Sequence, residues 1–458
     1  MNVIICGAGQ VGSSIARYLS SEGNDVTVID QSPDLIRKIN DTLDVRAFVG
    51  HASHPSTLEM AGAKEADMLI AVTYADEVNM VACQVGHSLF QVPTKIARIR
   101  SQNYLQPEWA DLFSRENMPI DVIISPEVEV ARHIGQQLQV PGAFDMLAMA
   151  DGKVRVVGVR CGDDCPVLNT PMRQLASLFP DLNMVVVAII RNDKVIVPSS
   201  EDQMLADDEV YFVCDTAHLA RAMAAFGHQE PEARRIIIVG AGNIGLTLAQ
   251  NIEENQAGVS VKLIEVSPER AKRAAGQLAK TMVLAGSALD PEILEEANIR
   301  STETFVAVSN DDEVNIISAL LAKRYGCERA VTLINNQPYG PLVTALGVDA
   351  VVNPRSITVS TILQHIRRGR IRAVHSLREG VGEVIEAEAL ETSTMVGVPL
   401  REAKLPNGVI VGAILREDEL VVPRGDTRIQ AKDRIILFAA SNAVKKVEKL
   451  FSVRLEYF

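Results

Sequence analysis

The chain contains the same glycine-rich pattern twice, once near its start and once just past its middle. Each copy is an apolar run that leads into the spacing G-x-G-x-x-G, at Gly7–Gly12 and at Gly240–Gly245. Each is followed by apolar residues four positions apart, and then by an apolar run that ends in an acid, Asp30 or Glu265. Strand, glycine-rich turn, helix and distal acid are the parts of a dinucleotide-binding βαβ unit. A lone glycine motif is weak evidence for this fold, whereas two copies with all parts in order are strong evidence.

Each part of the pattern has a physical task. The first glycine permits a tight turn, the second lets the backbone approach a pyrophosphate, and the third lets helix and strand pack closely. The helix N-terminus offers unpaired N–H groups and partial positive charge to phosphates. The acid accepts hydrogen bonds from the adenosine ribose and repels a 2′-phosphate, which favours NAD(H) over NADP(H).

The pattern therefore predicts two nucleotide sites, and the second is the more open to the alternative of a Rossmann unit kept for its fold alone. The predicted cofactor-binding residues from the pattern are Gly7, Ala8, Gly9, Gln10, Val11, Gly12 and Asp30 in the first copy, and Gly240, Ala241, Gly242, Asn243, Ile244 and Glu265 in the second.

The match between the halves extends well beyond the glycines. The run Ala71–Asn79 resembles Ala307–Asn315, and the spacing from Asp121 to Pro126 is repeated from Asp349 to Pro354. After each such unit the sequence becomes richer in β-branched residues with turn signals between them, which predicts a small α+β module. The predicted fold class is thus α/β, with two Rossmann-like doubly wound parallel-sheet domains, each followed by a small α+β domain.

These patterns also predict the boundaries of the domains. The predicted segments are a first Rossmann-like domain at 1–122, a crossover helix at 123–144, a small α+β domain at 145–226, a linker at 227–233, a second Rossmann-like domain at 234–352, a crossover helix at 353–371 and a second small α+β domain at 372–458.

Composition excludes several classes of function. A net charge of −13 argues against a general nucleic-acid binder and against adhesion to an anionic lipid surface. The chain enters a predicted strand at once, so we expect no secretory signal, and no apolar run approaches the ~18 residues that a membrane span needs. We therefore expect a cytoplasmic protein with reduced cysteines and no direct membrane insertion. We expect no metal site, because Cys161 and Cys165 lack a partner pair and His51 and His54 lack a third ligand.

With this layout the chain resembles the TrkA family, the regulatory subunits of bacterial Trk potassium-uptake systems, which carry tandem RCK domains with a KTN and a TrkA-C half each. The resemblance rests on the early glycine motif, on Ala71–Asn79 and on Ile96–Arg100, and it covers essentially the whole chain. It implies a non-enzymatic, nucleotide-sensing subunit on the cytoplasmic face of the inner membrane. It further implies binding of NAD+ or NADH, with ATP or ADP as regulatory ligands, a membrane-embedded potassium channel-like partner, and a homo-oligomer, with a tetrameric ring as the expected form.

The resemblance also adds residues to the first site. Thr73 and Tyr74 end a strand at the edge where open α/β sheets bind ligands, and Arg98 ends the next strand, where a guanidinium suits phosphate. The second half departs here, because alignment places Leu333 opposite Arg98 and Asn335 opposite Arg100. We therefore predict a weaker or differently selective second site.

Two structural readings compete with these functional ones. The spacing from Thr73 to Asp76, repeated from Ser309 to Asp312, also fits a helix-start signature, so we expect the two acids to cap helices. A stripe at Val130, Ile134 and Leu138 predicts helix packing, within the chain or, as the family suggests, between subunits.

The alternative function is an NAD-dependent oxidoreductase. A dehydrogenase needs a substrate domain and a general acid or base near the nicotinamide. Here each Rossmann half is followed only by a small module, and the sequence offers no evident pair of His, Lys or Tyr for that task. We therefore predict no catalytic residues and a regulatory rather than enzymatic role.

Overall fold

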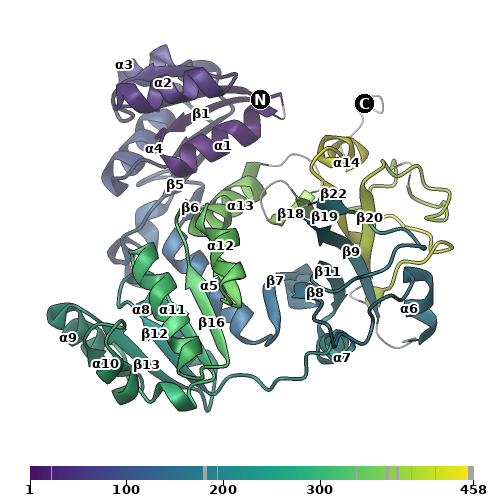
Figure 1. Ribbon diagram of the computed structural model, residues 1–458. Coiled ribbons are helices and arrows are strands. Elements are labelled where there is room, and N and C mark those ends of the chain that lie inside the picture. The colour runs from purple at the N-terminus through teal and green to yellow at the C-terminus, as the bar shows by residue number, and fades with distance from the viewer. Residues whose placement is uncertain are drawn as a thin grey trace. The chain divides into compact units, whose positions relative to one another are not determined.

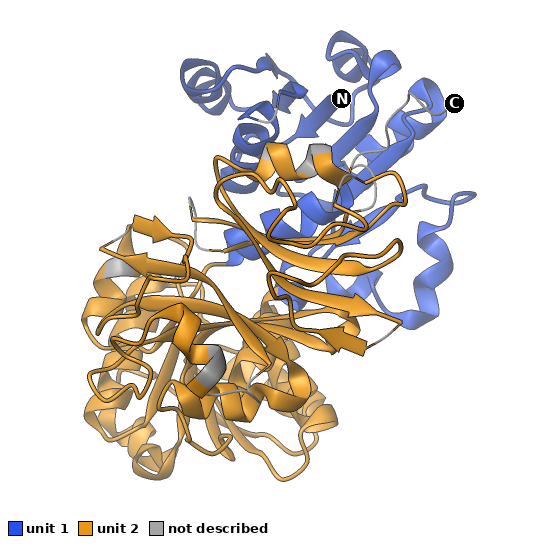
Figure 2. Cartoon of the chain, turned by 90° about the vertical axis from the view of Figure 1, so that its right-hand side faces the viewer, with its two compact units in different colours: residues 1–129, 354–366 blue, residues 130–353, 367–458 orange. Residues whose placement is uncertain are grey.

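The computed structural model describes residues 1–458 except 22, 179–182, 193, 337, 367–370, 378–380, 394, 418 and 452–458. The chain divides into two compact units, which Figure 2 shows in two colours: residues 1–129 with 354–366, and residues 130–353 with 367–458. Within the described part, no helix combines the length and the apolar character that crossing a membrane requires.

The first unit contains a six-stranded parallel sheet with helices around it (Figure 1). Its strand order is β3-β2-β1-β4-β5-β6, so the direction of the order reverses at β1 and β4, where open α/β sheets bind ligands. The strands are β1 (Asn2–Cys6), β2 (Asp25–Asp30), β3 (Arg46–Val49), β4 (Met68–Ala71), β5 (Thr94–Arg98) and β6 (Val122–Ile124), and the connecting helices are α1 (Gln10–Ser21), α2 (Pro33–Thr42), α3 (Pro55–Met60) and α4 (Asp76–Phe90).

The second unit repeats this sheet with the order β14-β13-β12-β15-β16-β17. The strands are β12 (Arg235–Val239), β13 (Ser260–Glu265), β14 (Met282–Ala285), β15 (Thr304–Ala307), β16 (Arg329–Leu333) and β17 (Ala350–Val352), and the helices are α8 (Asn243–Asn255), α9 (Pro268–Gln277), α10 (Pro291–Glu296), α11 (Asp312–Arg324) and α12 (Tyr339–Ala345). The central strands of both sheets are buried on both faces, which explains their continuous apolar runs.

Two five-stranded antiparallel sheets, also in the second unit, form the small domains. The first has the order β10-β9-β11-β8-β7 and the second β18-β19-β22-β20-β21. The first contains β7 (Ala143–Met149), β8 (Val154–Arg160), β9 (Met184–Arg191), β10 (Lys194–Ile196) and β11 (Glu209–Asp215), with α6 (Met172–Leu178) and α7 (Leu219–Ala225); the second contains β18 (Ile371–Leu377), β19 (Gly382–Glu388), β20 (Val409–Arg416), β21 (Glu419–Val421) and β22 (Arg434–Ala440), with α14 (Val444–Phe451).

The two small sheets share one apolar core. Val187 and Tyr211 of the first sheet lie in the same buried cluster as Val384 and Phe438 of the second. At Gly412 the approach is close, because a Cβ there would lie 2.6 Å from a methyl carbon of Val213. The predicted fold class, two Rossmann-like domains each followed by a small α+β domain, is therefore confirmed. The exact domain boundaries stay a prediction.

The two crossover helices are exchanged between the halves. Helix α13 (Pro354–Ile366), which follows the second parallel sheet in sequence, belongs to the first unit, where Ile362 and Leu363 pack in one core with Ile15 and Leu19 of α1. Helix α5 (Pro126–Leu138) follows the first sheet, but a Cβ at its Gly135 would contact Leu248 of α8 in the second. The stripe at Val130, Ile134 and Leu138 is fully buried within the chain, so the packing interpretation is confirmed.

Candidate functional site

The glycine-rich loop between β1 and α1 is shaped by steric requirements that differ among its glycines. Gly7 has φ of +114°, and a Cβ on Gly12 would lie 1.8 Å from the carbonyl oxygen of Gly7. No larger residue fits at either place without moving backbone. At Gly9, in contrast, a Cβ would meet nothing within 4 Å. The fold itself does not require a glycine at position 9, whereas a pyrophosphate lying against the loop would require one.

Asp30 ends β2 beside this loop, and its carboxylate holds the loop in place. Oδ2 accepts a hydrogen bond from Ala8 N at 2.6 Å, and Oδ1 accepts one from Ser32 N at 2.8 Å. No cation is paired with it among the described residues. Because a carboxylate can accept about four hydrogen bonds, each oxygen of Asp30 retains capacity for a ribose hydroxyl.

The loop after β4 is held by Asn79, which the sequence analysis did not assign a role. Its Oδ1 accepts hydrogen bonds from Thr73 N and Thr73 Oγ1 at 2.8 and 2.7 Å, and its Nδ2 donates to the carbonyl oxygens of Thr73 and Arg98. Asn79 is completely buried. One amide thus ties together the carboxyl ends of β4 and β5, the edge at which the ligand is expected.

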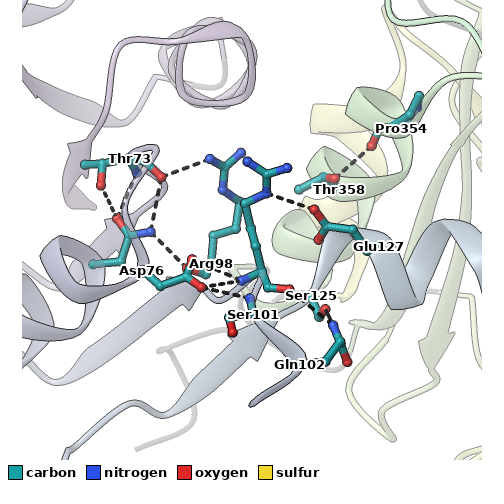
Figure 3. Close-up of polar contacts among 11 residues, drawn as sticks. Thr73, Asp76, Arg98, Ser101, Gln102, Ser125, Glu127, Pro354 and Thr358 are labelled. Atoms are coloured by element: carbon teal, nitrogen blue, oxygen red, sulfur yellow. Dashed lines mark hydrogen bonds and ion pairs between the residues drawn. The ribbon is translucent and has the colours of Figure 1, made fainter. Parts of the chain in front are cut away.

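Asp76 does not cap a helix, so that prediction was wrong. The N-cap of α4 is Ala75, without a side-chain hydrogen bond, and the Asp76 carboxylate instead accepts from the backbone N–H groups of Arg100 and Ser101 at 2.8 to 3.0 Å. Asp76 is the first residue of α4 and reaches the loop after β5 (Figure 3). The misassignment arose because a short acid near a helix start has the same local spacing whether it bonds its own helix or a distant loop.

Arg98 is the last residue of β5 and Arg100 lies just beyond it, and their guanidinium groups have different partners. Arg98 donates from Nη2 to the carbonyl oxygen of Thr73 at 2.9 Å (Figure 3), while its Nε is buried and has no hydrogen-bond partner among the described residues. Burial, together with the nearby charge of Arg100, lowers the pKa of the Arg98 guanidinium. A partly buried cation whose buried Nε lacks a partner is a destabilising arrangement that an anionic ligand would relieve.

Arg100 is already paired. Its Nε donates to Glu127 Oε1 of α5 at 2.8 Å, and its guanidinium lies 5.6 Å from the ring centroid of Tyr74. Burial alone would lower the pKa of Arg100, but the hydrogen bond and charge of Glu127 outweigh burial, and the pKa is raised. Tyr74, in the loop after β4, is 85% exposed, which is unusual for an aromatic side chain. The structure thus brings Gly9, Asp30, Thr73, Tyr74 and Arg98 to the same edge of the first sheet.

The second parallel sheet repeats the scaffold of this edge. Asn315 Oδ1 accepts from Ser309 N, and its Nδ2 donates to the carbonyl oxygens of Ser309 and Leu333. Asp312 accepts from the N–H groups of Asn335 and Asn336, so it too ties a loop; the cap of α11 is Asp311. The predicted capping role of Asp312 was therefore also wrong. Gly242, like Gly9, has open space at its missing Cβ.

The groups that face a ligand differ in the second copy. Leu333 ends β16 where Arg98 ends β5, as the alignment predicted, and Asn335 bonds Asp312 instead of reaching outward. The largest difference is at the acid. Glu265 accepts from Ala241 N and Ser267 N, and also from Arg270 Nε and Nη2 at 3.0 and 2.7 Å.

Arg270 was not among the residues predicted from the sequence. The signal was available, because Ser267-Pro268-Glu269-Arg270 follows Glu265 at the spacing at which Ser32-Pro33-Asp34-Leu35 follows Asp30. Burial would raise the pKa of Glu265, but its hydrogen bonds to Arg270 and to the two backbone N–H groups prevail, and the pKa is lowered.

Two further sequence features have defined positions. The rings of His51 and His54 stack with centroids 4.5 Å apart in the loop after β3, and His51 Nδ1 lies 2.8 Å from Ser53 Oγ. The six cysteines are buried and unbridged. In the described part of the chain, no group of three or more His, Cys, Asp or Glu side chains is arranged to hold a metal ion.

Comparison with known proteins places these features in a family context. The family model of the TrkA-N domain matches residues 3–126 and 236–354, and that of the TrkA-C domain matches residues 156–227 and 384–452. A Trk system potassium uptake protein TrkA from Azorhizobium caulinodans is 54% identical over 458 residues, covering 100% of both chains. The protein of that name from Halomonas elongata is 41% identical over 462 aligned residues, again covering 100% of both.

Solved structures share the architecture. The GsuK RCK domain superposes with a TM-score of 0.60 at 19% sequence identity, covering 99% of this chain and 95% of that chain. A GsuK channel bound to NAD gives a TM-score of 0.59 at 18% identity, covering 99% of this chain and 79% of that chain. At this level of identity the likeness concerns the fold.

Proposed function

The chain belongs to the TrkA family of Trk potassium-uptake proteins, and we propose that it is a regulatory subunit that senses NAD(H) in its first cleft and gates a membrane potassium-transport subunit. The cleft consists of Gly7–Gly12, Asp30, Thr73, Tyr74 and Arg98. ATP or ADP compete for the same cleft as regulatory ligands.

One observation carries this proposal: the buried Nε of Arg98 has no partner among the described residues, at the same sheet edge as Gly9, where a Cβ would meet open space. Without a ligand, each feature lowers the stability of the folded chain. The Arg98 Nε is a buried donor without an acceptor, and Gly9 loses more conformational entropy on folding than a larger residue would. A ligand phosphate at the glycine loop would use the α1 N-terminus, and a second phosphate contact would satisfy Arg98. Asp30 would accept the adenosine ribose through its remaining lone pairs.

Gating requires that the ligand bind one conformation of the assembly better than another. A ligand with equal affinity for both states shifts nothing, however tightly it binds. Thr73 lies in the loop after β4, and Arg98 is the last residue of β5. Asn79 and Asp76 of α4 bond these two segments, and β5 pairs with β6, so a ligand held by Thr73 and Arg98 is coupled to α4 and to β6. NAD+, NADH and ATP differ in charge and shape in the part of the ligand that would lie near Thr73 and Arg98. We therefore expect them to favour different conformations of the assembly.

The alternative, an NAD-dependent oxidoreductase, has less support in the geometry. A hydride-transfer site needs a general acid or base beside the nicotinamide. The polar groups at the end of β4 and β5 are engaged in tying loops, as the hydrogen bonds of Asn79 and Asp76 show. Turnover of NADH with a small carbonyl substrate would revive this alternative.

Calorimetric titration of NADH and of ATP into the full-length protein tests the proposal, with Gly9→Asp as the principal variant. Because the space at Gly9 is open, this variant is expected to fold and to lose binding. Gly242→Asp is the matched control in the second half and should leave first-site binding intact. Unchanged NADH affinity in Gly9→Asp, or absence of NADH and ATP binding by the wild type, would overturn the proposal.

The partner and the assembly are part of the same proposal. We propose that the subunit acts as a symmetric homo-oligomer, with a tetrameric ring as the expected form, on the cytoplasmic face of the inner membrane. Light scattering of the purified protein checks the first point, and a mass corresponding to a monomer at micromolar concentration would contradict it. Co-purification with the membrane subunit of a Trk system checks the second.

A further inference from the structure

The second Rossmann half contains a cation at the position that discriminates between the two classes of nicotinamide nucleotide. Glu265 is 4% exposed, and Arg270 bonds its Oε1 through both Nε and Nη2. In the first half, Leu35 stands at the corresponding position and Asp30 has no cationic partner among the described residues. The two acids therefore present different charge to the same part of a bound adenosine.

This ion pair removes both reasons for which the acid would select an unmodified ribose. Glu265 accepts four hydrogen bonds, three of them at Oε1, which leaves little capacity for ribose hydroxyls. Its negative charge is neutralised at short range by Arg270, so it no longer repels a second anion.

Arg270 retains donors for such an anion. Its side chain is 50% exposed, and among the residues that the structure describes its side chain bonds only Glu265, through Nε and Nη2. Nη1 and the second N–H of Nη2 can therefore donate to an oxyanion, in the planar fork that suits phosphate. The N-terminus of α9 lies beside it, where the Ser267 side chain accepts from Arg270 N and the first turn adds a positive dipole end.

We propose that the second half binds nucleotides that carry a phosphate on the 2′ oxygen of adenosine, the NADP(H) class, with Arg270 contacting that phosphate. The inference rests on the sequence-based prediction that the second glycine loop binds a nucleotide, and it goes beyond the proposed function, which concerns the first loop. The chain would then bind two classes of dinucleotide, NAD(H) without a 2′-phosphate at the site of Asp30 and NADP(H) with a 2′-phosphate at the site of Arg270. In the second half, Leu333 occupies the position that corresponds to Arg98, so one charged contact to the pyrophosphate is absent. The 2′-phosphate should therefore contribute a larger share of the binding free energy at the second site.

The test compares adenosine 2′,5′-bisphosphate with 5′-AMP by calorimetry on the full-length protein. Because a charge-assisted contact is gained, the bisphosphate is expected to bind about tenfold more tightly than AMP. Arg270→Leu, which installs the residue of the first half, should remove this preference, and Arg270→Lys should retain part of it. Lys272→Leu is the control, because Lys272 is exposed two residues further along α9.

Site assignment uses the glycine variants. Gly242→Asp should abolish the bisphosphate preference, and Gly9→Asp should leave it unchanged. A preference that survives Arg270→Leu, or that is lost in Gly9→Asp alone, would overturn the inference. NADH titrated into Arg270→Leu should bind the first site normally, which also shows that the variant is folded. If NADH fails to bind the wild type while the bisphosphate preference persists, the proposed function is wrong and this inference stands.

Discussion

The two Rossmann halves share their scaffold and differ in the side chains that face a ligand. Asn79 and Asn315 tie equivalent loops, as do Asp76 and Asp312. The open glycine position is also common to both. At the ligand-facing positions, however, Arg98 corresponds to Leu333, and Leu35 corresponds to Arg270. Duplication thus preserved the hydrogen bonds that form the cleft, while the groups that select its occupant diverged.

The same comparison extends to the small domains, where it predicts the largest effect on stability. His375 of β18 and Leu147 of β7 occupy equivalent positions in the two sheets, because His375 pairs with Val384 of β19 as Leu147 pairs with Val156 of β8. Burial, with His133 nearby, lowers the pKa of His375 from 6.5 to about 4. The unfolded chain therefore binds more protons between these values, and stability falls as pH falls from 6.5 toward 4. The cost approaches about 3 kcal/mol at the acid end.

His375→Leu should flatten this dependence, because the first half accommodates leucine at the same register. Urea unfolding at a series of pH values measures it. Some dependence will remain, since burial also lowers the pKa of His133, despite Asp145 nearby. An identical pH profile in the variant and in the wild type would show that His375 does not carry the effect.

The shared scaffold is tested by Asn79→Ala and Asn315→Ala. Each variant leaves backbone groups of two loops without partners, and we expect each to lower the free energy of unfolding of its domain by about 2 kcal/mol. Calorimetric unfolding measures the loss. Similar losses of unfolding free energy in both halves would support a structural role for the hydrogen bonds of Asn79 and Asn315. A loss in one half alone would contradict it.

The divergence at β5 and β16 is tested by Arg98→Leu, which gives the first site the residue of the second. Loss of a charged phosphate contact should weaken NADH binding by about 2 kcal/mol, or roughly 30-fold in Kd. Lys95→Leu is not a suitable control because Lys95 is buried and paired with Asp121; exposed Arg37→Leu on α2 serves instead. NADH affinity equal to that of the wild type would remove Arg98 from the site.

The smallest effect is expected at Asp30. Asp30→Asn keeps one of the two acceptor oxygens that hold the loop but loses the negative charge that strengthens a bond to ribose, so NADH should bind about 1 kcal/mol more weakly. Asp30→Ala is a poorer choice, because the structure shows that Asp30 also holds Ala8 N and Ser32 N. Titration of NADH against NADPH with Asp30→Asn measures both affinity and selectivity, and unchanged values would contradict the assignment.

The sequence by itself determined the duplicated α/β architecture and the position of the glycine loops. These features follow from local spacing, since strand and helix periodicities, turn glycines and an acid at a strand end are all read within one βαβ unit. Alignment of the two halves also predicted that Leu333 occupies the position of Arg98, and β16 and β5 do end at these two residues.

Only the tertiary structure decided what Asp76, Asn79 and Arg270 bond, and which sheet each crossover helix covers. Asp76 bonds the backbone N–H of Arg100, 24 residues further along the chain. Helix α13 follows the second parallel sheet in sequence but packs against α1 of the first. Sequence spacing identifies groups that are able to hydrogen-bond, but the partner is chosen by which elements the sheet topology brings together. Local pattern therefore fixes the elements of this protein, and long-range packing fixes the chemistry of its two clefts.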